Sequence, residues 1–137
     1  MNHVQQQILE AFAASGQNFE CENLVTEGGH ELSLLFFRHA SLGIVWDGTV
    51  IYADPLMEYA DYARLPKADL VLVTHEHYDH FDEKAIRVLL KPDTVIVGTV
   101  PERYTYIDDL GSGLLGQISD YSSGAVQPYD NSSENGK

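Results

Sequence analysis

The sequence has a single cysteine, Cys21, among 137 residues. One cysteine cannot form an internal disulfide framework, so nothing in the chain requires an oxidising compartment. No histidine or basic residue lies close to Cys21 in the sequence, which favours a buried or inert thiol over a nucleophile. We therefore expect a reduced, cytoplasmic protein.

Long hydrophobic runs and positive charge are also scarce. Residues 1–14 contain three glutamines and Glu10 where a secretory signal would need an unbroken apolar stretch, and no later run approaches the length of a membrane span. Basic residues number 8 against 21 acidic ones, and the formal net charge is −13. Such a charge repels a phosphate backbone and an anionic membrane surface. We expect neither nucleic acid nor membrane as a partner.

The overall composition is that of a folded protein. Hydrophobic residues make up 44% of the chain and charged residues 21%, which excludes extensive disorder. The length suits one domain with a modest core, and is short for a two-layered α/β hydrolase.

The first part of the chain predicts one helix and several hairpins. Residues 4–14 carry apolar side chains at helical intervals, which predicts a short amphipathic helix. Residues 19–55 consist of short apolar runs interrupted by a Gly-Gly pair at 28–29 and an Asp-Gly pair at 47–48. These pairs are strong hairpin signals, so we expect about four antiparallel strands.

The middle of the chain has a strand, helix, strand pattern. Residues 68–74 form an aliphatic run typical of a strand buried on both faces, and residues 94–100 form another. Between them, Asp82 can cap a helix over residues 83–91, which Pro92 ends. This order predicts an α/β layered domain with loops gathered at one end of the sheet.

The periodicity fades after Pro101. Serine, glycine, asparagine, aspartate and tyrosine dominate, and no helix or strand template fits beyond a turn. We therefore divide the chain into a partial domain at 1–103 and a divergent, partly disordered tail at 104–137.

Four potential metal ligands lie within six positions between the predicted strand and helix: His75, His77, Asp79 and His80. One loop histidine is usually only solvated, but three histidines and an aspartate together favour a metal site. In an extended loop, His75 and His77 would point the same way and hold one cation, while Asp79 and His80 would reach a second. This ligand set suits one or two zinc ions, with manganese or iron possible. Because such a site activates water, we expect hydrolysis.

The run THEHYDHFD at 74–82 resembles the H-x-H-x-D-H signature of the metallo-β-lactamase superfamily. The segments HASLGIVWDGTVIYADP and YADYARLPKADLVLVTHEHYDH resemble its branch of broad-specificity hydrolases that includes ascorbate-phosphate lactonase-like proteins. The resemblance implies an αββα sandwich of which this chain holds the N-terminal half, mostly antiparallel sheet with flanking helices. It also implies a metal centre that hydrolyses an ester, lactone, amide or phosphodiester bond in a small molecule.

The resemblance also assigns roles to residues. His75 and His77 would be ligands of a first metal, and Asp79 and His80 of a second. Asp79 would also orient the metal-bound hydroxide or return a proton to the leaving group, which makes it the candidate catalytic residue.

Two residues outside the loop are expected to support the ligands. Asp54 corresponds to an early aspartate of the superfamily that orients the site by hydrogen bonding. His39 is expected to be a structural hydrogen-bonding residue beneath the metal loop. Tyr59 and Tyr62 could line a substrate entrance or simply cover a sheet edge.

The sequence also departs from the superfamily pattern. Members complete the centre with two further histidines and a bridging aspartate from the second half of the sandwich, but no histidine follows His80. A truncation, a frameshift, or a compact relative that completes its site across a dimer could explain this. A half-sandwich leaves one apolar sheet face uncovered, so we expect a homo-oligomer. The alternative function is a catalytically incompetent metal-binding or oligomerising fragment.

Overall fold

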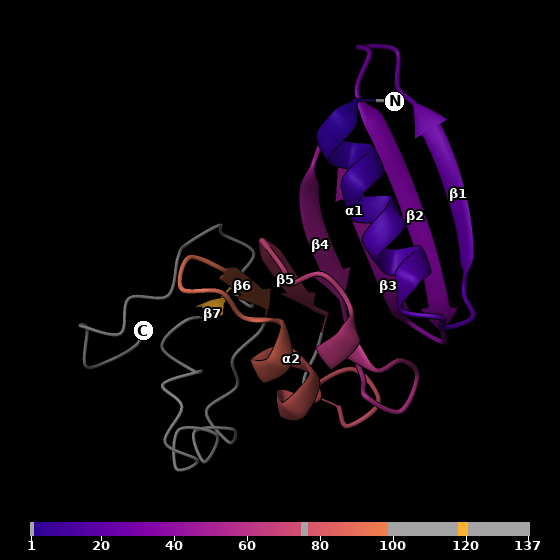
Figure 1. Cartoon of the computed structure of the whole chain (residues 1–137). Helices are drawn as coiled ribbons and strands as arrows, with labels where there is room; N and C mark the ends of the chain where they lie inside the picture. Colours follow the sequence, from indigo (N-terminus) through magenta and orange to yellow (C-terminus); the bar gives the residue numbers. More distant parts are fainter. Residues whose placement is uncertain (1, 75–76, 99–117, 121–137) are drawn as a thin grey trace.

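The computed structural model describes residues 2–74, 77–98 and 118–120, and shows one sheet with two α-helices (Figure 1). The elements, in chain order, are α1 (His3–Ala14), β1 (Glu20–Val25), β2 (Glu31–Arg38), β3 (Ser41–Trp46), β4 (Thr49–Ala53), the 3-10 helix η1 (Tyr62–Arg64), β5 (Leu70–Val73), α2 (Glu83–Leu89), β6 (Val95–Gly98) and β7 (Ile118–Asp120). The seven strands follow each other in the sheet in the order of the sequence. This mixed α/β architecture confirms the predicted fold class.

Strands β1 to β4 form an antiparallel meander, as the turn signals predicted. Gly29 and Gly48 have φ values of 86° and 88° in the turns that close the first and third hairpins. Glycine adopts this left-handed conformation without steric cost. The hairpin between β2 and β3 turns at His39, which has a φ of 55° without being glycine. His39 therefore lies in the tight turn just before β3.

The second half of the sheet is parallel. Strand β5 pairs with β4, β6 with β5, and β7 with β6, all in the parallel sense. Since β2 runs in the same direction as β4, the carboxyl ends of β2, β4, β5 and β6 share one edge of the sheet. We call this the carboxyl edge. Strand β7 lies within the predicted tail, where no strand was expected.

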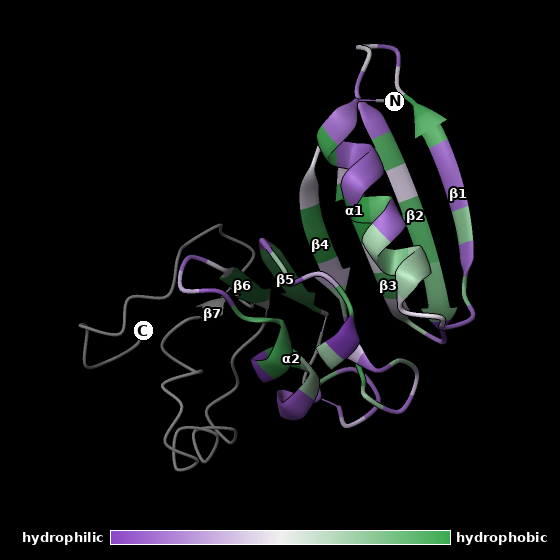
Figure 2. Cartoon of the chain, viewed as in Figure 1, coloured by the Kyte–Doolittle hydropathy of each residue, from purple (hydrophilic) through white to green (hydrophobic). Residues whose placement is uncertain are grey.

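Both α-helices contribute to a core on one face of the sheet, which we call the helix face (Figures 1 and 2). A row of facing positions across the sheet is buried there: Leu35, Gly43, Tyr52, Val71 and Ile96. The fully buried apolar side chains of the helices are those of Phe12 in α1 and of Ala85, Ile86 and Leu89 in α2. These are the apolar stripes that the helical periodicity predicted.

The opposite face of the sheet, which we call the outer face, is also apolar. Its central row is Leu34, Ile44, Ile51, Leu70 and Val95. None of these side chains is fully buried, and Val95 is 49% exposed. Phe36 and Trp46, on the same face, are 44% and 37% exposed. Both α-helices of the described part of the chain lie on the helix face, so within that part the outer face has no helical layer, as expected of a half-sandwich.

Within the described residues, no helix is both long and apolar enough to cross a membrane.

A hydrogen-bonded cluster ties two hairpin turns together at the end of the sheet opposite the carboxyl edge. The Asp47 carboxylate contacts His30 Nδ1 at 2.5 Å and accepts a bond of 2.8 Å from the backbone N–H of Glu31. The His30 ring also stacks on Trp46, with the ring centroids 4.9 Å apart. The backbone bond from Glu31, followed by the bond from His30, holds the pKa of Asp47 below its ordinary value.

We expect Asp47→Asn to change the acid dependence of stability. A carboxyl group whose pKa is lowered by folding stabilises the protein fully above its unfolded pKa, and this contribution disappears as the pH falls through the folded pKa. Asparagine tolerates the positive φ of this position, 46°, so the turn should persist. The melting temperature of Asp47→Asn should lie below that of the parent at pH 7, and the difference should shrink near pH 3. A difference that does not vary with pH would contradict this account.

Candidate metal centre

Three segments that are distant in the sequence meet at the carboxyl edge. His39 follows β2, Asp54 follows β4, and residues 77–80 belong to the loop after β5. Because these strands end at the same edge, the topology alone brings the segments together. His75 and Glu76, in the same loop, lie outside the described residues.

Asp54 is the buried anchor of this edge. It is fully buried and has a φ of 44°, and its carboxylate accepts bonds from the backbone N–H of Thr74 at 2.7 Å and the Thr74 hydroxyl at 2.6 Å. Its own backbone is held by β5 and β3, since its N–H donates to the Leu72 carbonyl and its carbonyl accepts from the Ser41 hydroxyl. The carboxylate is therefore fixed in position before any ligand binds.

His80 is oriented by Asp54. Its Nδ1 lies 2.8 Å from Asp54 Oδ2, and its side chain is 16% exposed. A carboxylate can only accept, so Nδ1 carries the proton of this bond. In the neutral imidazole this leaves Nε2 as the atom with a lone pair, which is the state that a metal ligand requires. Nε2 lies on the side of Asp79, 3.7 Å from Asp79 Oδ1.

The loop after β5 is a compact turn at residues 77–80, and the extended conformation that we expected for it is wrong there. The N–H groups of His80 and Phe81 both donate to the His77 carbonyl, at 2.8 and 2.9 Å. The alternation of side chains that was used to assign ligands to two cations therefore does not apply beyond His77. Tyr78, within this turn, is 88% exposed.

The turn brings Asp79 and His80 together with His39. One nitrogen or oxygen from each of these three residues lies within 4.8 Å of the others. His39 Nε2 is 3.4 Å from Asp79 Oδ2, and the rings of His39 and His80 are 5.1 Å apart. Two imidazoles and one carboxylate are a donor set that zinc accepts. The residues therefore fit the metal that the sequence pattern implied.

The charge of the site also favours a cation. Among the residues that the structure describes, the carboxylates of Asp54 and Asp79 pair only with histidines, and no lysine or arginine lies within ion-pair distance of either. Two carboxylates in a chain of net charge −13 create a negative potential at this edge. A divalent cation would neutralise it.

The other residues singled out from the sequence fall in different places. His77 is exposed and does not belong to the three-residue group. His39 is 46% exposed, so it is not buried beneath the loop. Tyr62 is buried in the core and does not line an entrance, whereas Tyr59 contacts His39 with the ring centroids 6.4 Å apart.

Cys21 is exposed, so of the two states that the sequence favoured, buried or inert, the buried one is excluded. It lies on β1, the edge strand, whose side chains are all exposed. Partial burial, followed by the charge of Glu22, raises the pKa of the thiol. Cys21 therefore remains a thiol at neutral pH and is a weak nucleophile, in line with the inert thiol that the sequence favoured.

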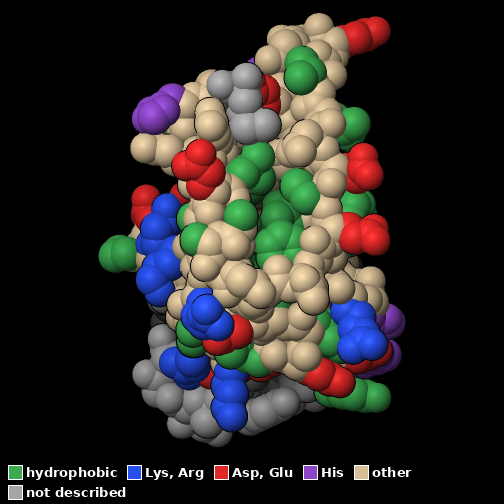
Figure 3. Space-filling view, turned by 45° about the vertical axis from the view of Figure 1, so that its right-hand side comes forward, with side chains coloured by type: hydrophobic (Ala, Val, Ile, Leu, Met, Phe, Trp, Pro, Cys, Tyr) green, Lys and Arg blue, Asp and Glu red, His purple; other side chains and the backbone are tan. Residues whose placement is uncertain are grey.

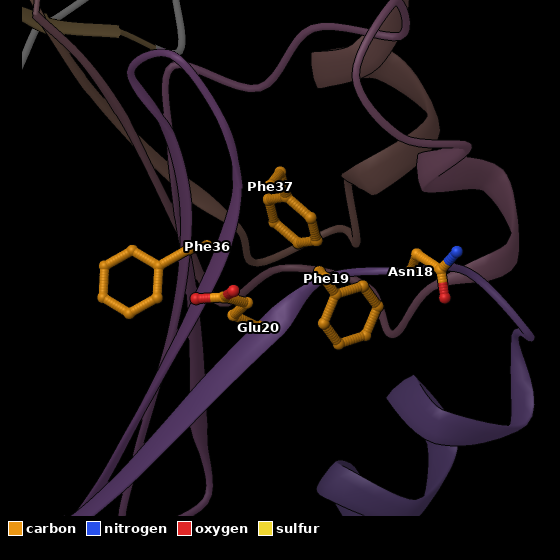
Figure 4. A pocket seen from close by; sticks show the side chains of 5 residues that line it. All are labelled: Asn18, Phe19, Glu20, Phe36 and Phe37. Atoms are coloured by element: carbon orange, nitrogen blue, oxygen red, sulfur yellow. The ribbon is translucent and has the colours of Figure 1, made fainter.

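A hollow on the β1 side of the molecule is separate from this centre. It is lined by Asn18, Phe19, Glu20, Phe36 and Phe37. Figure 3 shows hydrophobic side chains gathered there beside acidic ones, and Figure 4 shows Phe19 and Phe37 facing each other while Phe36 points away. Glu20 is its one titratable lining residue among those described. An adjoining hollow of about 400 Å³ runs along residues 36–42 and reaches His39. The second hollow is the one that adjoins the candidate centre.

Comparisons with known proteins agree with this fold and identify a family. The family model of the β-lactamase superfamily domain matches residues 33–131. A UPF0173 protein of Pyrococcus abyssi is 27% identical over 95 residues, which cover 65% of this chain and 45% of that protein. A crystal structure of a "putative metal-dependent hydrolase" from Parabacteroides distasonis is similar with a TM-score of 0.61 and 38% identity, over 78% of this chain and 48% of that one. The chain thus spans about half the length of these relatives, and the matched region extends beyond residue 103.

Proposed function

The chain belongs to the β-lactamase superfamily, and from this membership we propose that it is the metal-binding part of a metal-dependent hydrolase. The convergence of His39, Asp79 and His80 beside the buried Asp54 carboxylate carries the proposal. The substrate that we propose is a small ester, lactone or phosphorylated metabolite. The metal that we propose is zinc, as one or two ions.

We propose a separate role for each residue at the carboxyl edge. Asp54 holds the proton of His80 on Nδ1, so that Nε2 stays available as a ligand. His75 and His77 are proposed to hold a first zinc ion, and Asp79 and His80 a second. Bound zinc lowers the pKa of its water to about 7 and polarises the scissile bond. Asp79 is proposed to orient the attacking oxygen and to return a proton to the leaving group.

The test is metal content followed by hydrolysis. We expect one or two zinc ions per chain by elemental analysis, and loss of most of this metal in the His75→Ala/His77→Ala double variant. His30→Ala is the matched control, because His30 is also a turn histidine beside an aspartate but lies at the other end of the sheet. The loaded parent should hydrolyse at least one of a chromogenic ester, a lactone and a phosphodiester. A parent that binds no zinc would contradict the proposal.

The second candidate function is a metal-binding or oligomerising fragment without catalytic activity. Its support is that residues 81–137 include no histidine that could complete the ligand set. In that case zinc would bind with the same dependence on the loop histidines, but all three chromogenic substrates would remain intact.

A further inference from the structure

His39 belongs to the candidate centre although it lies 36 residues before the motif that predicted the metal site, at His75. We propose that His39 is a direct metal ligand, which binds through Nε2 the same cation as the Asp79 carboxylate and His80 Nε2. The inference rests on the proposed function only in that a cation occupies this edge. It replaces the supporting role that the sequence suggested for His39.

Two of the three distances among the donors resemble those of a zinc site, and the third is at most 4.8 Å. Ligand atoms at about 2.0–2.1 Å from a tetrahedral zinc ion lie about 3.4 Å from one another. The distance from His39 Nε2 to Asp79 Oδ2 is 3.4 Å, and the distance from His80 Nε2 to Asp79 Oδ1 is 3.7 Å. Small side-chain rotations would therefore bring the three donors around one ion. Three protein donors leave the fourth position open for water, as in catalytic zinc sites.

The backbone of His39 supports a role for its side chain. His39 has a φ of 55°, a left-handed conformation that residues other than glycine rarely adopt. In the two other hairpin turns of the meander, glycine holds a left-handed position, at Gly29 and Gly48, although Asp47 shares that conformation in the turn before Gly48. At the turn that reaches the carboxyl edge, the chain instead has an imidazole, which faces the carboxylate of Asp79.

The burial of the donors is graded in the way that an open metal site requires. The side chain of His80 is 16% exposed and is fixed from behind by Asp54, whereas Asp79 and His39 are 36% and 46% exposed. The cation would thus be anchored on the protein side by His80 and would face solvent between the other two donors. The hollow along residues 36–42 opens at this side of His39.

The test is cobalt and zinc binding by the full chain. His39→Asn removes the ligand nitrogen but keeps a residue that tolerates a positive φ. We expect the zinc affinity, measured by competition with a chromogenic chelator, to fall by at least about tenfold, since even partners that only orient a ligand are worth about 10- to 100-fold. The visible absorption of bound Co²⁺ should weaken as water replaces the imidazole. His30→Ala should leave both measurements unchanged.

A second variant distinguishes direct ligation from a structural role. In His39→Cys, a thiolate bound to Co²⁺ should give a ligand-to-metal charge-transfer band in the near ultraviolet, and the parent should lack this band. Unchanged affinity in His39→Asn together with no such band in His39→Cys would overturn the inference, even if the protein hydrolyses substrates. If binding depends on His39 but no substrate is cleaved, the inference stands and the proposed hydrolase fails. A parent that binds neither metal would overturn both.

Discussion

Replacement of Asp54 by alanine is expected to lower the free energy of unfolding by about 3 kcal/mol and to weaken zinc binding by about 10- to 100-fold. The buried carboxylate accepts bonds from the Thr74 N–H, the Thr74 hydroxyl and His80 Nδ1. Its removal leaves these donors without the Asp54 acceptor. The alanine must also adopt a φ of 44°, which is unfavourable for a residue that has a Cβ but no polar side chain. His80 then loses both its orientation and the bond that selects its tautomer.

Two further variants separate the effect on the fold from the effect on the metal. Asp54→Asn keeps the shape, tolerates the positive φ, and can still accept from Thr74, so it should recover most of the lost stability. It cannot accept from both Thr74 and His80 as a carboxylate does, so the zinc affinity should stay low. Asp69→Ala is the matched control, because Asp69 accepts from the Val50 N–H and pairs with Lys91 just before β5, at the opposite end of that strand.

The measurements are urea unfolding of the metal-free protein and chelator competition for zinc. Asp69→Ala should lose some stability but no zinc affinity. If Asp54→Ala unfolds at the same urea concentration as the parent and binds zinc equally well, Asp54 does not organise this edge. Equal zinc affinity in Asp54→Asn and the parent would show that zinc binding needs only the hydrogen bonds between residue 54 and Thr74, and not the bond to His80.

Much of the fold could be predicted from short-range signals. The Gly-Gly and Asp-Gly pairs located two hairpins, and the aliphatic run at 68–74 located β5, because these patterns act over a few residues. The polar residues that dock α1 could not be predicted in this way. Gln5 is fully buried and bonds both the Val45 carbonyl and the Gly48 N–H, yet its sequence context marks it only as a polar helix residue.

The candidate centre shows the same division. The motif around His80 identified the loop, because four ligand-type residues in six positions are rarely accidental. The grouping of His39 with Asp79 and His80 depends instead on the directions of β2, β4 and β5, which no local pattern fixes. A signal was nevertheless present, since His39 sits between two strongly apolar runs where a turn residue was required. Strand β7, with three residues, is too short to produce a detectable alternation.

The outer face of the sheet leads to the second large expected effect, which concerns association. On this face, the side chains of β2 up to Phe36 and those of β3 to β6 are uncharged, and the central row from Leu34 to Val95 is apolar throughout. Phe36, Trp46 and Val95 on this face are exposed, and the equivalent apolar face of a second copy would cover them. We therefore expect a protein of these 137 residues to sediment as a dimer at micromolar concentration.

A charge at the centre of this face should dissociate the dimer. Ile44→Glu introduces a carboxylate on β3 that would face the outer face of the second copy. Because burying an unpaired charge costs several kcal/mol, the dissociation constant of the dimer should rise by at least about 100-fold. Val4→Glu is the control, because Val4 is apolar and 53% exposed but lies on α1, on the helix face. Sedimentation velocity should show a monomer for Ile44→Glu and a dimer for Val4→Glu. A monomeric parent, or a polydisperse aggregate that Ile44→Glu does not disperse, would exclude paired outer faces, because a twofold contact between identical surfaces closes at two copies.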